Sequence, residues 1–178
     1  VQAQSLSVGD AFNRHSGLVD QYLFALEAVA DESGLSLDPV AETYYLMTAV
    51  VDFLPRLIET EAQARGRAAT LDAVLAAGKD PGTLERFQLQ ALASQGDVLR
   101  RRAAAQVGKV GATAPELAKR LEAAAQKADA ASQSFFAKLQ SELIAPQTKA
   151  APSPEALFGA GSQAIAAQRE LLGGMAAA

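Results

Sequence analysis

The chain has 178 residues and a formal net charge of -4 at pH 7, so no overall positive field attracts it to nucleic acid or anionic lipid. It contains no cysteine, which excludes disulfides, thiol catalysis and zinc sites built from thiolates. Hydrophobic residues make up 49% of the chain but aromatic residues only 6%, which suits helices packed side by side better than a β-sandwich.

The first helix is predicted at about residues 5–32, where apolar residues recur at alternating spacings of four and three. This spacing is typical of a helix that packs along one face. That face carries Val8, Phe12, Val19, Tyr22, Leu26 and Val29. His15, the one histidine of the chain, falls on the same face, and we expect it to be buried and hydrogen-bonded. Ser33 and Gly34 are expected to end the helix.

The second helix is predicted at about residues 39–77, with Asp38 as N-cap and Pro39 at the first helical position. It would span roughly 58 Å at about 1.5 Å per residue and therefore needs long neighbours. Pro55 lacks the N–H that would bond the carbonyl of Val51, so we expect a bend there. The predicted buried face carries Met47, Val50, Leu54, Leu57, Glu61, Ala64, Ala68, Leu71 and Leu75.

The third helix is predicted at about residues 81–107. Gly78 is expected to end the second helix, and Asp80-Pro81 repeats the Asp-Pro start that precedes it. Two glycines within residues 108–115 are expected to interrupt the third helix after Val107. Its predicted buried face carries Leu84, Phe87, Ala91, Leu92, Val98 and Leu99.

Two more helices are predicted at about residues 115–144 and 154–175, joined by a proline-containing loop. Thr113 is the expected N-cap of the first of them. Its buried face is expected to carry Leu117, Leu121, Ala124, Ala128, Ala131, Phe135 and Leu139. The last helix is expected to pack through Leu157, Phe158, Ile165, Leu171, Leu172 and Met175.

No segment shows the period-two alternation of a strand, so the predicted fold class is all-α. We expect one domain over residues 1–178, an antiparallel bundle of long helices that resembles a four-helix bundle and contains about five helices. If every short link reverses the chain, five helices leave the termini at opposite ends. Either residues 108–115 form a bend instead of a reversal, or a further helix precedes Val1.

Catalytic and cofactor motifs are missing from the sequence. It contains no G-x-S-x-G turn for a serine nucleophile, no cluster of metal-ligating residues and no Gly-rich loop with the spacing that cradles phosphate. Glu59 and Glu61 alternate around the helix and do not converge. We therefore expect no catalytic residue, no metal, no cofactor and no enzymatic activity.

Several polar residues on predicted helices allow two interpretations. Arg100, Arg101 and Arg102 lie about 100° apart around a helix, so they form a solvated face unless one reaches a carboxylate ligand in a groove. Glu61 and Arg65, one turn apart, form either an ion pair within the helix or a polar layer inside the bundle. Such a layer would set helix register or line a ligand pocket.

Tyr44 and Tyr45 are the other unusual pair. They also point about 100° apart, so one can pack inward while the other faces a groove or a partner subunit. Core packing of both rings, with the hydroxyls bonded locally, is the plainer interpretation.

Residues 12–78 resemble the extracytoplasmic sensor regions of bacterial methyl-accepting chemotaxis receptors and related sensor histidine kinases. The matching features are Ser33-Gly34-Leu35, Leu37-Asp38-Pro39, Tyr44-Tyr45-Leu46-Met47, Leu54-Pro55 and Arg65-Gly66, and His15 also fits the pattern. This resemblance implies an all-helical ligand-binding domain in the periplasm, part of an inner-membrane receptor. Two membrane helices would flank the domain, and cytoplasmic signalling modules would follow it. The chain, which begins at Val1, would then be a fragment of that receptor.

The sequence-based hypothesis is thus a non-enzymatic sensor domain that forms a homodimer. It either binds a small molecule such as an organic, amino or aromatic acid between its helices or is contacted by a periplasmic binding protein. The ligand-contact candidates are Tyr44, Tyr45, Arg65 and Arg67. Tyr45 and Arg65 are about 30 Å apart along one helix, so the candidates mark two alternative locations. The second hypothesis is a helical adaptor or structural protein that binds partner helices. An enzyme is the third.

Overall fold

The computed structural model describes residues 7–146 and 154–178, and these residues form helices and no strands. The first helix is α1 (Val8–Glu32), followed by a short 3-10 turn, η1 (Leu35–Leu37). The second is a continuous rod of α2 (Ala41–Met47), η2 (Thr48–Phe53) and α3 (Leu54–Ala76). Then come α4 (Thr83–Thr113), α5 (Pro115–Leu139) with its extension η3 (Gln140–Ile144), and α6 (Pro154–Ala176). The predicted all-α fold is confirmed.

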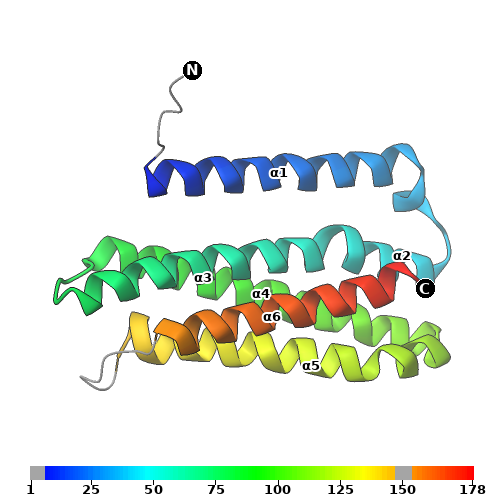
Figure 1. Ribbon diagram of the computed structural model, residues 1–178. Coiled ribbons are helices and arrows are strands. Elements are labelled where there is room, and N and C mark those ends of the chain that lie inside the picture. The colour runs from blue at the N-terminus through cyan, green and yellow to red at the C-terminus, as the bar shows by residue number, and fades with distance from the viewer. Residues whose placement is uncertain (1–6, 147–153) are drawn as a thin grey trace.

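The helices α3, α4, α5 and α6 form a four-helix bundle, and α1 lies along its outside (Figure 1). Each rod runs antiparallel to the one before it, so α1 begins at one end of the molecule and α6 ends at the other. The predicted alternative of a bend at residues 108–115 is therefore wrong, because the chain reverses there. A helix ahead of Val1 stays a prediction.

The helix α4 continues past its predicted end at Val107 and runs through both glycines to Thr113. Thr113 does not cap the next helix; its hydroxyl donates instead to the carbonyl oxygens of Lys109 and Val110, at 3.2 and 3.3 Å. Ala114 alone links α4 to α5. A glycine inside a helix costs only about 1 kcal/mol, and full burial of Val110 favours continuation of the helix.

Both Asp-Pro sequences begin their helices later than predicted. Asp38 accepts a hydrogen bond from the Val40 N–H at 2.8 Å, and Asp80 accepts one from the Gly82 N–H at 3.0 Å. In each case the aspartate closes a turn around the proline, and the helix starts one residue after that turn. Asp38 is therefore not an N-cap, and Pro39 lies outside the helix.

Gly78 ends the long second rod as predicted. Its φ is 69°, in the left-handed region that glycine tolerates, and its N–H donates to the carbonyl oxygen of Leu75. The helix is irregular just before Pro55, where the π-helical segment η2 ends, and the bend expected at Pro55 stays a prediction. Within η2 the N–H of Leu54 bonds the carbonyl of Ala49, five residues back. Such wide turns absorb irregularities that an α-helix cannot.

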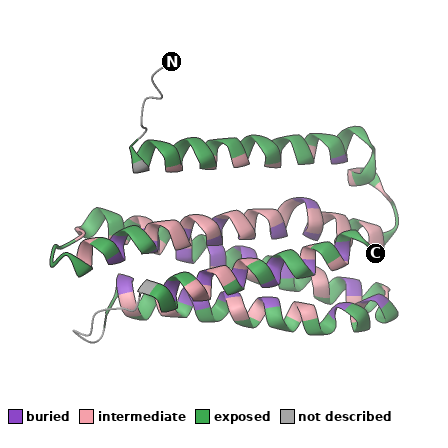
Figure 2. Ribbon diagram, in the orientation of Figure 1, coloured by how far each residue is buried: buried purple, intermediate pink, exposed green. Residues whose placement is uncertain are grey.

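The core lies between α3, α4, α5 and α6 (Figure 2). The predicted face of the second rod is confirmed from Leu54 to Leu71, since Leu54, Leu57, Glu61, Ala64, Ala68 and Leu71 are buried. Met47, Val50 and Leu75 are only half-buried, and Ala49 and Val51 are the buried residues of η2. On α5, Leu117, Leu121, Ala128, Phe135 and Leu139 are buried as predicted, together with Ser132. On α6, Leu157, Leu171 and Met175 are buried, but Phe158 is exposed, contrary to prediction.

The predicted face of α4 is mostly wrong. Leu84, Phe87 and Val98 are exposed. Leu99 is buried as predicted, and the other buried residues are Leu89, Ala93, Gly96, Ala103 and Val110. Small residues on this face let α5 approach closely, and a Cβ at position 96 would lie only 2.1 Å from the Phe136 ring. The prediction followed the large apolar residues, whereas half of the buried positions are occupied by small ones.

The helix α1 is peripheral, and Ala30 is its one buried side chain among those described (Figure 2). Tyr22 is 68% exposed, and the predicted burial of His15 is also wrong, because α1 faces the bundle through Phe12, Val19 and Leu23. A partly exposed ion pair joins Glu27 of α1 to Arg56 of α3. No helix in the described residues is long and apolar enough to cross a membrane.

Candidate functional site

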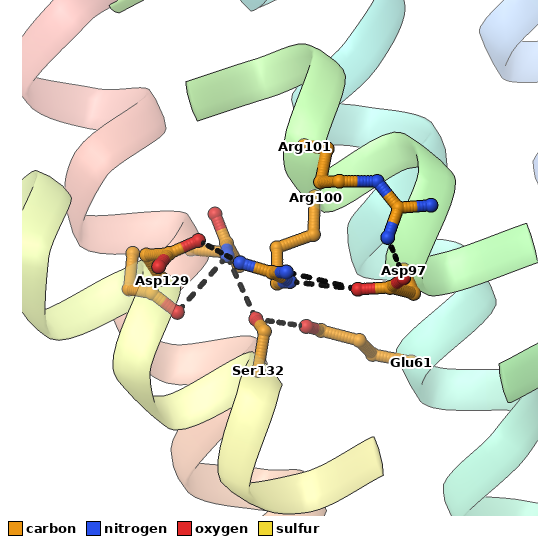
Figure 3. Close-up of polar contacts among 8 residues, drawn as sticks. Glu61, Asp97, Arg100, Arg101, Asp129 and Ser132 are labelled. Carbon is orange, nitrogen blue, oxygen red and sulfur yellow. Dashed lines mark hydrogen bonds and ion pairs between the residues drawn. The ribbon is translucent and has the colours of Figure 1, made fainter. Parts of the chain in front are cut away.

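Three buried polar residues lie in one layer across the bundle: Glu61 of α3, Ser132 of α5 and Gln168 of α6. We call them the polar layer. The Ser132 hydroxyl donates to Glu61 Oε1, and the two side chains point toward one another (Figure 3). Gln168 Nε2 donates to Ser132 Oγ at 2.8 Å and to the carbonyl oxygen of Ala128 at 3.2 Å. Three helices are thus joined by buried side-chain hydrogen bonds within a mainly apolar core.

The polar layer contains a buried carboxyl group with a raised pKa and two oxygen atoms that lack a hydrogen-bond partner. Glu61 is fully buried, and burial raises its pKa to about 7, against the hydrogen bond from Ser132, which acts to lower it. Glu61 Oε2 and Gln168 Oε1 are both buried without a hydrogen-bond partner. The predicted ion pair between Glu61 and Arg65 is not formed, since Arg65 bonds elsewhere, so the alternative of a polar layer describes the structure.

A pocket with a volume of about 230 Å³ lies between α4, α5 and α6, and we call it the α4–α5–α6 pocket. Its apolar lining comes from Ala103, Ala104, Val107, Ala125, Ala128 and Leu171. Its polar lining comes from Arg100, Gln126, Asp129 and Gln168. Because Gln168 is 2% exposed and belongs to both, it connects this pocket to the polar layer. Mainly apolar walls with a few polar groups are typical of small-molecule sites.

Arg100 lies at the border of this pocket and is not part of a solvated face. Its side chain is 14% exposed and lies between Asp97 and Asp129 (Figure 3). Nη1 donates to Asp129 at 2.5 Å, and Nη2 donates to Asp97 at 2.9 Å. Arg101 also pairs with Asp97. Of the three consecutive arginines, Arg100 therefore does reach carboxylates. They are side chains of the protein, however, and not the carboxylate of a ligand.

The structure brings Tyr44 and Tyr45 together, with ring centroids 5.6 Å apart in an edge-to-face arrangement. Tyr45 is half-buried, and the Lys109 ammonium lies 5.1 Å from its ring centroid. Tyr44 is exposed and lines a second pocket of about 370 Å³ between α1 and the second rod. Glu27, Asp31 and Asp52 line the same pocket, so its electrostatics disfavour an acid.

Arg65 and Arg67 are not brought together. Arg65 lies 4.7 Å from the ring centroid of Phe158 and donates to Ser162 Oγ at 2.9 Å, so it contacts α6. Arg67 lies 5.1 Å from the ring centroid of Phe12 and donates to Gln88 at 2.7 Å, so it contacts α1 and α4. Both guanidinium groups already connect helices.

Sequence reasoning found Glu61 but missed Ser132 and Gln168. The buried positions of α6 are spaced by four and three, as Leu157, Gly161, Ala164, Gln168, Leu171 and Met175. Gln168 could have been recognised because it is a polar residue within this buried series, just as Glu61 was recognised in the second rod. In the described residues no group of three or more His, Asp or Glu side chains could hold a metal ion.

No protein-family model matches the chain, and neither does any curated protein or solved structure. The function must therefore be argued from the chemistry of the site.

Proposed function

We propose that the chain is a non-enzymatic sensor domain that binds a small molecule in the α4–α5–α6 pocket. One observation carries this proposal: a mainly apolar pocket lies against a buried polar layer in which two side-chain oxygens have no partner. Most buried polar groups in native proteins are hydrogen-bonded, and the exceptions tend to have a function. A layer that served only to hold the helices together would need no unpaired acceptors.

The signal would pass through α6. Gln168 of α6 bonds Ser132 and the Ala128 carbonyl of α5, while Leu171 of the same helix lines the pocket. A bound molecule changes the contacts of both α6 residues, which favours one position of the helix over another. Packed helices shift between discrete arrangements, so a small axial or rotational movement of α6 is the expected output.

The resemblance of residues 12–78 to chemoreceptor and sensor-kinase domains supplies the proposed context. In that context the domain lies in the periplasm and is anchored to the inner membrane by flanking segments. It forms a homodimer, and α6 leads to the second membrane span. Chemotaxis and kinase signalling are both compatible outputs.

Two experiments test this function. The first is a thermal-shift screen of the chain against amino acids, organic acids, amines and alcohols, in which a bound compound raises the melting temperature by mass action. The second is inspection of the complete reading frame. Apolar segments of about twenty residues before Val1 and after Ala178 support a receptor. A screen without any hit, or a reading frame without such segments, argues against it.

One observation favours the adaptor as a second candidate. The outer face of α1 exposes large apolar side chains, with Leu18 50% and Val29 65% exposed beside Tyr22. Such residues suit contact with another helix. Replacing Tyr22 and Val29 by serine should abolish binding to partner helices if the chain is an adaptor, and should leave small-molecule binding intact if it is a sensor.

A further inference from the structure

One acceptor of the polar layer lacks a hydrogen-bond donor at any pH. Gln168 Oε1 is buried without a partner, and an amide oxygen can only accept. Glu61 Oε2 is also unpartnered, but it is an acceptor only while the carboxylate is ionised, and burial raises the pKa of Glu61 to about 7. The one hydroxyl hydrogen of Ser132 already goes to Glu61, and the Gln168 amide already donates twice. Gln168 Oε1 therefore lacks a donor, which a bound molecule with a donor group would supply.

We propose that the α4–α5–α6 pocket binds a small, mainly apolar molecule that carries a hydrogen-bond donor, a hydroxyl or an ammonium group, and that this donor bonds Gln168 Oε1. The inference rests on the proposed function, because it names the ligand class of the same pocket. Alcohols and amines share this donor chemistry. Carboxylic acids in their ionised form lack it.

Arg100 is the one cation among the described residues that line the pocket, and it is already paired with two carboxylates. Its Nε and Nη2 both donate to Asp97, and its Nη1 donates to Asp129. An incoming carboxylate would have to share the guanidinium with these two aspartates, and both of their negative charges would repel it. An incoming donor is not opposed in this way, because the unpaired atom is a neutral acceptor.

The geometry also limits the size and the approach of the ligand. A volume of about 230 Å³ lies below the range of roughly 300–1,000 Å³ that holds drug-sized ligands, so the occupant is smaller. Gln168 lines the pocket, and its Oε1 is buried. The terminal torsion of a glutamine is broad, so the amide can turn to present Oε1 to a molecule in the pocket. This turn also moves Nε2 away from Ser132 and the Ala128 carbonyl, so the bond to the ligand replaces part of the present hydrogen bonding.

The test compares n-pentanol, n-pentylamine and pentanoate, which have the same carbon chain and different polar ends. Each is titrated into the 178-residue chain, and binding is followed by the NMR shifts of the Val107 and Leu171 backbone amides. We expect the alcohol and the amine to bind at least about tenfold more tightly than pentanoate. Gln168→Met, which keeps the length of the side chain, should weaken their binding about tenfold, the order of one lost hydrogen bond.

The matched control is Gln163→Met, at an exposed glutamine of the same helix, which should leave all three affinities unchanged. Pentanoate binding in the pocket as tightly as pentanol would overturn the ligand class and leave the proposed function standing. The same conclusion follows if Gln168→Met binds the alcohol as tightly as the wild type. If none of the three binds and the wider screen finds a ligand elsewhere on the chain, the pocket is wrong but the sensor is not. If no compound binds at all, both proposals fail.

Discussion

Glu61 is a carboxylate without a cationic partner in the middle of a helical bundle. Its burial makes the charged form unfavourable, which is why its pKa rises from 4.5 to about 7. The folded state therefore binds a proton more tightly than the unfolded state does. The stability that the neutral form provides is fully present below about pH 4.5 and is lost as the pH rises through 7.

Glu61→Gln should remove this pH dependence, because an amide of the same shape never ionises. Between pH 5 and pH 8 the free energy of unfolding of the wild type should fall relative to that of the variant by on the order of 2–3 kcal/mol. Urea unfolding of both proteins at the two pH values measures the difference. A gap between variant and wild type that does not change with pH would show that Glu61 does not titrate in this range.

At the scale of the elements, the contact between α4 and α5 depends on the absence of a side chain. Gly96 faces the ring of Phe136, which is itself buried, whereas Gly108 of the same helix has open space where a Cβ would be. The two glycines of this helix therefore differ in the space available to an added Cβ atom.

Alanine at these two positions should have clearly different effects. Gly108→Ala should stabilise the protein by up to about 1 kcal/mol, through helix propensity alone. Gly96→Ala gains the same propensity but forces Phe136 out of place, and overpacking costs about 1–3 kcal/mol, so it should destabilise the protein or be close to neutral. Thermal unfolding of both variants measures this. Equal stabilisation by both would mean that α4 and α5 are not in close contact at Gly96.

The same interface explains which elements could be predicted from the sequence. The second rod shows one regular apolar face from Leu54 to Leu71, and that face is the buried one. On α4 several large apolar residues, Leu84 and Phe87 among them, are exposed, whereas the small residues Ala93 and Gly96 are buried. Spacing alone does not tell a packed small residue from a surface one. Of the polar layer only Glu61 was predicted, because it interrupts a clearly apolar face, whereas Gln168 follows the small residues Gly161 and Ala164.

At the scale of the whole molecule, the bundle divides into a core of four helices and a loosely attached α1. The apolar pattern of α1 predicted a packed helix, yet among its described side chains only that of Ala30 is buried. Its contacts with α3, such as the Glu27–Arg56 ion pair, are partly exposed and therefore contribute little stability. We infer that α1 opens more easily than the rest of the chain.

Hydrogen exchange should show this difference directly. In dilute solution the amides of α1 should exchange faster than those of α3 to α6, because α1 can open without unfolding the core. Light scattering on the same sample establishes whether the chain is a monomer, since a second copy on α1 would protect it. Equal protection of α1 and α3 in a monomer would contradict the division.

We propose above all that the chain binds a small molecule between α4, α5 and α6. The most direct test is NMR mapping of the compounds that raise the melting temperature in the screen. We expect the largest shifts on residues around the pocket, such as Val107, Ala125 and Leu171, and on the side-chain amide of Gln168. Shifts gathered instead at Tyr44 and Tyr45, with no change at Gln168, would contradict it.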